Sequence, residues 1–417
     1  MVSSHSAFAS APTESVGLRS ETVRSANLAT VLRVLHFGGP TSRSEMVART
    51  GLTRSAIGAL IGELVRTGLV VERRAMSDGS PGRPSPVAAV LSDQNVALAV
   101  EVLVDSIGVA AVGLGGVVLH SVRIDRARDR VSVDRTIDDI VDTVARVRPH
   151  LAPSCRIIGM GVGVVGIVRR SDNSVSIAPN LGWRDVAFGA QLSAALGEAF
   201  PVSLANDADM AALAEVRRGA AMGTDDALCI WGEVGVGGGL ISRGEPVTGA
   251  SGFAGEVGHI PVNPDGRQCQ CGSVGCWETE IGEGALLRRT GRPADGGRAA
   301  VDEVLCDAAD GVPAALEALA VEARWLGIGL SGLINVLNPS MIVLGGLFGR
   351  LHPLIAQQLN DEIMRRALPS ASAQVQVVPS KIGADAVLLG AAELAFAAVL
   401  TDPLGALDRH DALAAAR

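Results

Sequence analysis

The N-terminal part of the chain contains stretches in which apolar residues recur every three or four positions, the spacing that places them on one face of a helix. The first apolar stripe runs from Leu28 to Leu35 and ends near Gly38. Ser42 followed by Glu45 forms a capping box, which starts a short second helix that stops at Gly51.

A third helix follows directly, with Thr53 as its N-cap and Gly68 at its end. Its apolar face consists of Ile57, Leu60, Ile61, Leu64 and Val65. A tight turn between the second and third helices predicts a helix-turn-helix. We expect Thr53, Arg54 and Ser55, on the solvent face of this helix, to contact DNA. The other residues on that face are small, so the helix can enter a major groove.

The residues after the third helix predict a wing. Residues 69–74 form an apolar strand, residues 77–85 a turn rich in Gly and Pro, and residues 86–90 a returning strand. Arg83, between Gly82 and Pro84, is the wing residue expected to enter the minor groove, although Gly-Arg-Pro is also an ordinary turn. A three-helix unit that serves only for packing or dimerisation is the alternative to DNA binding.

From residue 95 onward, short apolar strands alternate with amphipathic helices, which predicts an α/β body. The expected strands cover residues 96–103, 108–112, 117–124 and 156–168, and later 202–205, 227–231, 239–242 and 341–344. Expected helices cover residues 133–147, 208–218 and 384–400. Two strand-rich lobes on either side of a cleft would produce this alternation.

Charge separates the two parts of the chain. Residues 1–90 carry ten Arg and six acidic residues, a net charge of +4, whereas the other 327 residues carry −12 of the total of −8. We interpret residues 1–22 as a disordered tail, 23–90 as the DNA-binding domain, 91–400 as the body and 401–417 as a C-terminal tail. No uninterrupted apolar run reaches the roughly 18 residues of a membrane helix, so we expect a soluble cytoplasmic protein without a membrane partner.

Three of the six cysteines lie within eight residues, at Cys269, Cys271 and Cys276, shortly after His259. One imidazole and three thiolates form a ligand set that suits tetrahedral Zn²⁺ and leaves no position for water. We therefore expect a structural zinc loop over residues 259–276. The alternative is three unpaired thiols near a core histidine, and Cys-x-Cys-x₄-Cys with a nearby histidine rarely arises without a metal.

A second group of polar residues suggests a sugar site. Asn206 and Asp207 lie where a strand ends and a helix begins, although an acid there is commonly only a cap. Glu256 precedes the expected zinc ligand His259 by three residues, and Glu278 follows the thiols, so metal binding would bring both carboxylates to one place. Carboxylates accept hydrogen bonds from neighbouring hydroxyl groups, which favours a polyhydroxy ligand.

These motifs together resemble the ROK family of repressors, open reading frames and kinases, in its winged-helix regulator branch of xylose and N-acetylglucosamine repressors. The resemblance is carried by CQCGSVGCWE at 269–278, GASGFAGEVGH at 249–259, NDADMAALAE from Asn206 and GRP at 82–84. It implies two actin-like or hexokinase-like lobes with a sugar in the cleft. It also implies that the sugar contacts are Asn206, Asp207, Glu256, His259 and Glu278.

Kinase members of this family hold the nucleotide with Asp-x-Gly-Gly-Thr on the first hairpin and Gly-Thr-Gly on a second loop. The equivalent residues here are Glu101, Val102, Leu103, Val104 and Asp105, and then Glu233, Val234 and Gly235. Branched side chains block the backbone from the phosphates, and two added carboxylates repel them. Asp207, the general base of the kinases, would then be vestigial.

The predicted function is a sugar-responsive transcriptional regulator, a repressor of carbohydrate genes without kinase activity. We expect a homodimer or a dimer of dimers on a palindromic DNA operator, with a monosaccharide or sugar phosphate as effector. One alternative is a DNA-binding, ATP-dependent sugar kinase similar to glucokinase. Another is a regulator whose body no longer binds sugar and instead contacts a protein partner.

Overall fold

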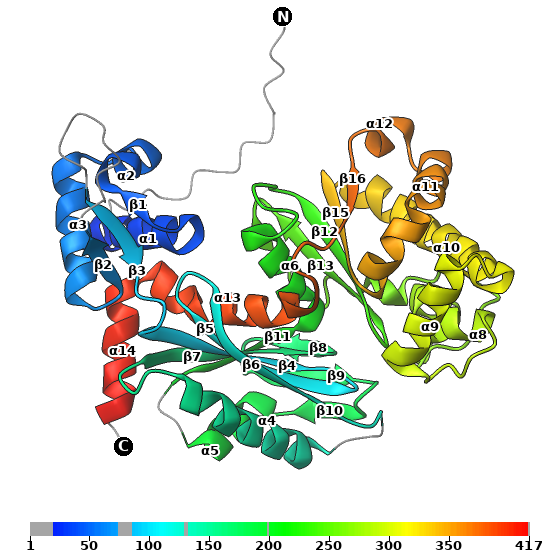
Figure 1. Cartoon of the computed structure of the whole chain (residues 1–417), viewed down its shortest axis with the longest axis horizontal. Helices are drawn as coiled ribbons and strands as arrows, with labels where there is room; N and C mark the ends of the chain where they lie inside the picture. The colour runs from blue at the N-terminus through cyan, green and yellow to red at the C-terminus, as the bar shows by residue number, and fades with distance from the viewer. Residues whose placement is uncertain (1–19, 74–85, 129–131, 198–199, 416–417) are drawn as a thin grey trace, which may run out of the picture.

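The computed structural model describes residues 20–73, 86–128, 132–197 and 200–415. These residues form a small N-terminal unit and two larger lobes, each containing a five-stranded sheet (Figure 1). The expected fold class, a winged helix-turn-helix followed by a two-lobed α/β body, is confirmed.

The N-terminal unit combines helices with a three-stranded sheet. Its elements are α1 (Ser20–Gly38), β1 (Thr41–Ser42), α2 (Arg43–Thr50), α3 (Arg54–Arg66), β2 (Val70–Arg73) and β3 (Val87–Val90). The Ser42 and Glu45 capping box is present at α2, and the Thr53 hydroxyl accepts the Ala56 amide at the start of α3. Strands β2 and β3 are antiparallel, as expected for a wing, whereas its tip and Arg83 lie outside the described residues.

The first lobe is built on a sheet in the order β11-β7-β4-β5-β6. These strands are β4 (Asn95–Val102), β5 (Ser106–Gly113), β6 (Val117–Asp125), β7 (Arg156–Val164) and β11 (Val202–Asn206). Successive residues of a strand point to opposite faces of its sheet. Val96, Leu98 and Val100 of β4 therefore join the core under α4 (Val133–Val147), while Ala97 and Ala99 join the core under α13 (Ala386–Thr401).

One strand expected over residues 156–168 is instead two, and this prediction was wrong. The chain turns at Gly166, where φ is +113° and an added Cβ would lie 2.6 Å from the Ile177 carbonyl oxygen. The residues that follow enter a second sheet made of β8 (Ile167–Arg169), β9 (Ser174–Ala178) and β10 (Trp183–Val186). Helix α5 (Phe188–Leu196) then leads back to β11.

The second lobe repeats the topology of the first, with the sheet order β14-β13-β12-β15-β16. Its strands are β12 (Ala227–Gly232), β13 (Val236–Ser242), β14 (Glu245–Pro246), β15 (Met341–Gly346) and β16 (Gln376–Pro379). In each lobe three consecutive strands pair antiparallel, and two later strands join parallel beside the first of them. This duplication agrees with the two-lobed body that was expected.

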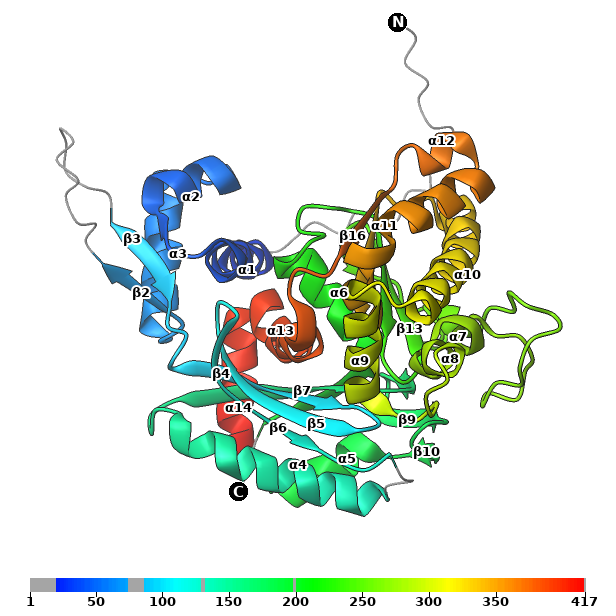
Figure 2. The same cartoon turned by 45° about the vertical axis from the view of Figure 1, so that its right-hand side comes forward.

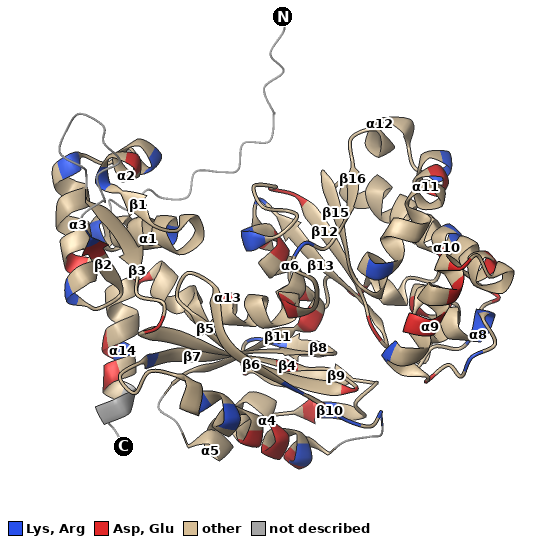
Figure 3. Ribbon diagram, viewed as in Figure 1, with Lys and Arg blue, Asp and Glu red and all other residues tan. Residues whose placement is uncertain are grey.

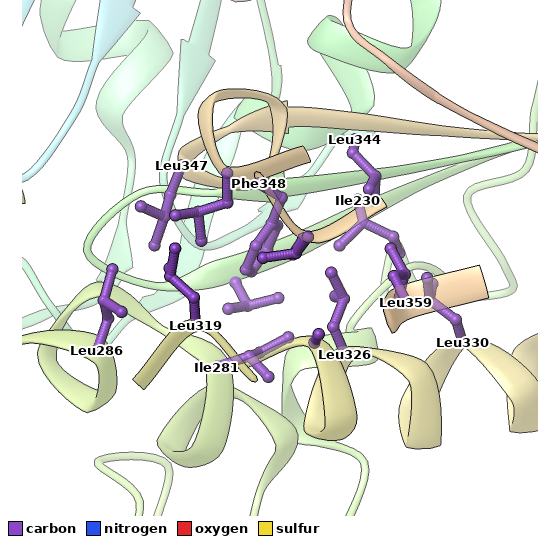
Figure 4. Packing of buried hydrophobic residues seen from close by; sticks show 14 of the residues in the cluster. Ile230, Ile281, Leu286, Leu319, Leu326, Leu330, Leu344, Leu347, Phe348 and Leu359 are labelled. Atoms are coloured by element: carbon purple, nitrogen blue, oxygen red, sulfur yellow. The ribbon is translucent and has the colours of Figure 1, made fainter. Parts of the chain in front are cut away.

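Helices between β14 and β16 build most of the second hydrophobic core. They are α7 (Trp277–Ile281), α8 (Glu283–Arg289), α9 (Gly297–Ala309), α10 (Pro313–Leu337), α11 (Leu347–Arg366) and α12 (Pro369–Ser372). Figure 4 shows Leu326 of α10, Phe348 and Leu359 of α11 and Ile230 of β12 within one buried cluster. This core supports the loop that carries the cysteines, because Trp277, directly after Cys276, is fully buried in it.

Two helices cross between the lobes. Helix α6 (Asp207–Arg218) follows the last strand of the first lobe and packs on β12 and β13 of the second, whereas α13 follows β16 and packs on β4 and β7 of the first (Figure 2). They also pack on each other, and an added Cβ at Gly390 would lie 1.8 Å from the Met210 carbonyl oxygen. Any movement of one lobe against the other must therefore pass through this helix pair.

Residues 1–19 and 416–417 of the expected chain tails lie outside the described residues, and the rest of both segments is largely helical. Residues 20–22 are the first turn of α1, which an Arg24–Glu63 ion pair of 2.6 Å ties to α3. The C-terminal residues form α14 (Pro403–Ala415) rather than a tail, because Leu407 joins the core shared by α1 and α13. The apolar periodicity over residues 403–415 is too weak to predict α14, because this helix depends on contacts with distant segments of the chain.

Helices α10 and α13 are long and apolar enough, by length and composition alone, to cross a membrane. More than half of each apolar window, 56% and 61% respectively, is buried inside the protein. Both helices supply residues to the hydrophobic cores described above, so their apolar composition is explained by packing.

Candidate functional site

Asn206 and Asp207 lie at the junction of β11 and α6. The Asn206 side-chain oxygen accepts the amides of Ala208 and Asp209 at 2.8 and 3.2 Å, and its amide nitrogen donates to the Gly166 carbonyl at 3.0 Å. This caps α6 and fixes the next residue, Asp207, on the wall of a cavity between the lobes. Burial raises the pKa of Asp207 to about 6.

The five residues expected to bind sugar all line this one cavity of about 210 Å³, here named the central cavity: Asn206, Asp207, Glu256, His259 and Glu278. They come from both lobes. Burial raises the pKa of Glu256; His259 opposes this shift, and the neighbouring carboxylates of Asp207, Asp209 and Glu278 add to it. One Glu278 oxygen accepts the Val236 amide at 3.0 Å. The cavity therefore presents closely spaced carboxyl groups, which are acceptors for hydroxyl groups.

The residues expected to bind zinc also come together. The ligand atoms of His259, Cys269, Cys271 and Cys276 all lie within 4.8 Å of one another, and the sulfur atoms of Cys271 and Cys276 are 3.7 Å apart. Two sulfurs bound to one tetrahedral zinc at about 2.3 Å would be about 3.8 Å apart. The spacing of the thiols is thus compatible with a structural zinc site.

His259 connects the thiols to the central cavity. Its Nδ1 lies 3.7 Å from the Cys269 sulfur, whereas its Nε2 lies 3.8 Å from Glu256. The loop reaches this geometry through Gly275, where φ is +70° and an added Cβ would lie 1.6 Å from the Asn263 carbonyl oxygen. One ring nitrogen therefore faces the thiols and the other faces the cavity.

The residues expected at the position where kinases bind phosphate form ion pairs within this chain. The Arg128 guanidinium lies 2.7 Å from the carboxylate of Asp105 in the first hairpin. It also pairs with Glu283 of α8, where one nitrogen–oxygen distance is 3.1 Å. Arg128 therefore links the two lobes. Glu233 pairs with Arg298 at 3.5 Å. The acidic side chains of Asp105, Glu233 and Glu283 are thus each paired with an arginine.

Glu101, expected at the position of the kinase aspartate, lies on β4 and is almost fully buried. Burial raises its pKa to about 7, against the effect of Arg123, whose guanidinium lies 2.5 Å away.

The N-terminal unit exposes the beginning of α3. Thr53, Arg54 and Ser55 are all exposed, and the Thr53 hydroxyl is used in capping, with Ser55 3.1 Å from it. Arg43 pairs with Glu72 at 2.6 Å, in a unit where basic and acidic segments are mixed (Figure 3). In the described part of the chain Arg54 has no ion-pair partner, so its guanidinium is available to a nucleic acid.

One polar cluster was not predicted from the sequence. His36 at the end of α1 is fully buried, accepts the Gly115 amide on Nδ1 at 2.9 Å, and lies 2.9 Å from Glu393 of α13 through Nε2. Arg218 at the end of α6 donates to Glu393 at 2.8 Å and to the Gly115 carbonyl at 2.9 Å. Polar residues within apolar helical stripes, such as His36 and Glu393, were the available signal.

The junction between the unit and the body is also tightly bonded. The Asn95 side chain donates to the carbonyls of Gly68 and Leu91 at 2.8 and 3.1 Å, and the Leu91 amide donates to Leu69 at 2.9 Å. The core formed by α1 and α3 continues into β4, β5 and α13. The N-terminal unit is therefore held against the first lobe by a continuous apolar core.

Comparison with known proteins places this chain. It is 27% identical to the xylose repressor of Bacillus subtilis over 374 residues, which cover 88% of this chain and 94% of the repressor. A solved ROK family transcriptional regulator, a homologue of the E. coli MLC protein, superposes with a TM-score of 0.75 at 26% identity, covering 93% of this chain and 99% of that one. A ROK glucokinase from Streptomyces griseus, solved with glucose and AMPPNP, superposes with a TM-score of 0.63 at 28% identity, covering 72% and 98%. Residues 97–398 match the ROK family, and the protein belongs to it.

Proposed function

We propose that this protein is a sugar-responsive transcriptional repressor that acts as a soluble cytoplasmic dimer on a palindromic operator. The observation that carries the proposal is the course of α6. The helix begins at Asp207 in the central cavity and ends at Arg218, which contacts α1 of the N-terminal unit. Eleven residue steps of a helix span about 17 Å, so one rigid element joins the effector cavity to the DNA-binding unit.

In this proposal the sugar hydroxyls donate to the carboxylates of Asp207, Glu256 and Glu278, and His259 contributes its Nε2. Because these residues come from both lobes, the sugar binds the closed arrangement of the lobes better than the open one. Closure moves α6 along α13, and Arg218 changes its position relative to His36 and Glu393. The N-terminal unit is fixed to the first lobe. Closure of the lobes therefore changes the orientation of this unit relative to its copy in the dimer, which alters operator affinity.

Zinc has a structural part in the proposal. The residues that would hold it are His259, Cys269, Cys271 and Cys276, whose ligand atoms lie within 4.8 Å of one another. Bound there, the ion supplies a fixed cross-link of the loop and no open coordination position. His259 and Glu278 would then be held at the cavity wall.

The family resemblance also supports a second function, an ATP-dependent sugar kinase, because Asp207 is present where the kinases have their general base. Against it stand Asp105 and Glu233, whose carboxylates would repel a triphosphate at the position that the resemblance implies, and the pairing of Arg128 with Asp105 and Glu283, which occupies a nearby cation. We propose that kinase activity has been lost. Formation of ADP that depends on a hexose and disappears in Asp207→Asn would overturn this part of the proposal.

The function is tested by a mobility shift with DNA from the promoter region of the protein's own gene, repeated with pentoses, hexoses, amino sugars and their phosphates. At least one sugar should change operator affinity about tenfold or more, a coupling of about 1.4 kcal/mol. Glu256→Ala should abolish the response while DNA affinity without sugar stays unchanged. Glu317→Gln, an exposed acid on α10, serves as the control. A protein that binds no DNA, or that binds DNA without response to any sugar, would refute the proposal.

A further inference from the structure

A second cavity lies beside the central one, here named the flanking cavity. Its volume is about 520 Å³, compared with about 210 Å³ for the central cavity, and Asn206 lines both. The flanking cavity is enclosed by Arg169 and Arg170 at the end of β8, by Asp209 of α6, and by Thr248, Ser251 and Phe253 of the loop before Glu256. The flanking cavity is thus larger than the central cavity, and of the five residues expected to bind sugar it contains only Asn206.

Asp209 points to a ligand in the flanking cavity. Its side chain is more than nine-tenths buried, with 7% of the residue exposed, and in the described part of the chain its Oδ1 has no hydrogen-bond partner. Burial raises the pKa of Asp209 to about 7, with Arg170 opposing the shift and Asp207 adding to it. A buried polar atom without a partner destabilises the protein, so a ligand group that forms a hydrogen bond with it would offset this cost.

The other lining groups favour a neutral polyhydroxy ligand. Phe253 leaves 52% of its surface exposed, and its ring offers an apolar face to the C–H side of a sugar ring. Thr248 and Ser251 add hydroxyl groups that both donate and accept.

The same lining disfavours an anionic ligand. Arg169 is already paired with Asp172 at 3.1 Å and Asp185 at 3.5 Å, and the Asp209 carboxyl group would repel a phosphate or carboxylate that approached Arg170. An apolar ligand is excluded by the same charged groups, because it would remove them from water without hydrogen bonds.

We propose that the flanking cavity is a second sugar subsite, and that the effector is a neutral disaccharide or glycoside with one ring beside Asp207 and the next beside Asp209 and Phe253. Asn206, shared by both cavities, marks the position of the link between the rings. This inference rests on the proposed function, since it assumes that the central cavity binds the first ring.

The test is calorimetric titration of the full-length protein with matched pairs of sugars: D-glucose against maltose and cellobiose, and D-xylose against xylobiose. At least one disaccharide should bind about tenfold tighter than its own monosaccharide. Asp209→Asn and Phe253→Ala should each weaken that disaccharide about tenfold, about 1.4 kcal/mol, and change monosaccharide affinity less than about twofold. The controls are Glu317→Gln and Leu316→Ala, an exposed acid and an exposed apolar residue on α10.

The outcomes separate the two proposals. If monosaccharides bind and no disaccharide binds more tightly, or if Asp209→Asn weakens both kinds of sugar equally, the second subsite is refuted and the proposed function stands. If no sugar in this panel produces heat, the second subsite is refuted, and the mobility shift with the wider set of sugars decides the proposed function. If Asp209→Asn fails to fold, Phe253→Ala alone decides, because this exposed side chain contributes little to folding.

Discussion

Arg218 of α6 and Glu393 of α13 form a buried ion pair, with 2.7 Å between the nitrogen and oxygen atoms. The pair lies beside the fully buried His36 of α1. Burial alone would raise the pKa of Glu393, but His36 and Arg218 hold it below its ordinary value. The carboxylate is therefore charged at neutral pH, and the three parts of the molecule meet at one electrostatic contact.

Glu393→Gln should damage both stability and signalling. Removing one partner of a buried pair leaves a buried charge uncompensated and costs about 3–5 kcal/mol. We expect denaturant unfolding to show this loss, and the sugar-dependent change in operator affinity to fall severalfold while sugar affinity changes little. Glu245→Gln breaks the exposed Arg217 pair on the same helix, 2.7 Å long, and should cost less than about 1 kcal/mol. Equal effects of the two variants would contradict a special role for Glu393.

The Arg128 bridge should control the opening of the cleft. Arg128→Ala leaves Asp105 and Glu283 without their shared partner, so the lobes should separate more readily. We expect a larger radius of gyration in solution scattering without sugar, and an apparent sugar affinity that falls with the fraction of closed protein. Arg292→Ala, whose partners Glu303 and Asp307 lie in the same lobe, is the control. An unchanged radius and affinity would show that Arg128 does not hold the lobes.

Stability should depend on pH through Glu101. Its folded pKa of about 7 lies above the ordinary value of 4.5, so the folded protein holds the proton more tightly than the unfolded chain. This contribution is fully present below pH 4.5 and is lost as pH rises to about 7. The Glu101→Gln variant does not lose this contribution. The difference between its unfolding free energy and that of the unmodified protein should therefore grow by on the order of 3 kcal/mol between pH 4.5 and about pH 7. A difference independent of pH would contradict the raised pKa.

Removing the metal should affect both folding and sugar binding. Purified protein should contain about one zinc per chain by elemental analysis, and a strong chelator or Cys271→Ser should lower the Tm by about 5 °C or more. Sugar binding should be lost with it, because the loop positions His259 and Glu278. Cys306→Ser, an exposed cysteine outside the cluster, should change neither property. Protein that is free of metal yet fully stable would rule out a structural zinc site.

Arg54→Ala tests the start of α3 as the DNA-reading element. If its guanidinium contacts a phosphate, the variant should lower operator affinity and reduce the slope of affinity against salt by about 1. Arg365→Ala, an exposed arginine on α11 of the second lobe, should leave both unchanged. The same result for both variants would show that the described face of α3 does not bind DNA.

Local features could be predicted from sequence because they depend on residues only a few positions apart. The Ser42 and Glu45 capping box, the Thr53 cap and the helix over residues 133–147 all occur at the expected positions. The turn at Gly166 and the helix α14 were not predicted. Both depend on backbone packing against segments that are distant in the chain, Ile177 in the first case and α1 in the second.

The sequence by itself determined the types of chemistry in this protein: the helix caps, the thiol loop around His259, and the carboxyl groups of Asp207, Glu256 and Glu278 within their separate motifs. Their spacing is local, so short motifs carry it. Only the tertiary structure decided which charges meet, because Arg128 pairs with a residue 155 positions away and Arg218 with one 175 positions away. Those partners are brought together by the crossing of α6 and α13 and by the closeness of the two lobes, which depend on the packing of the whole core.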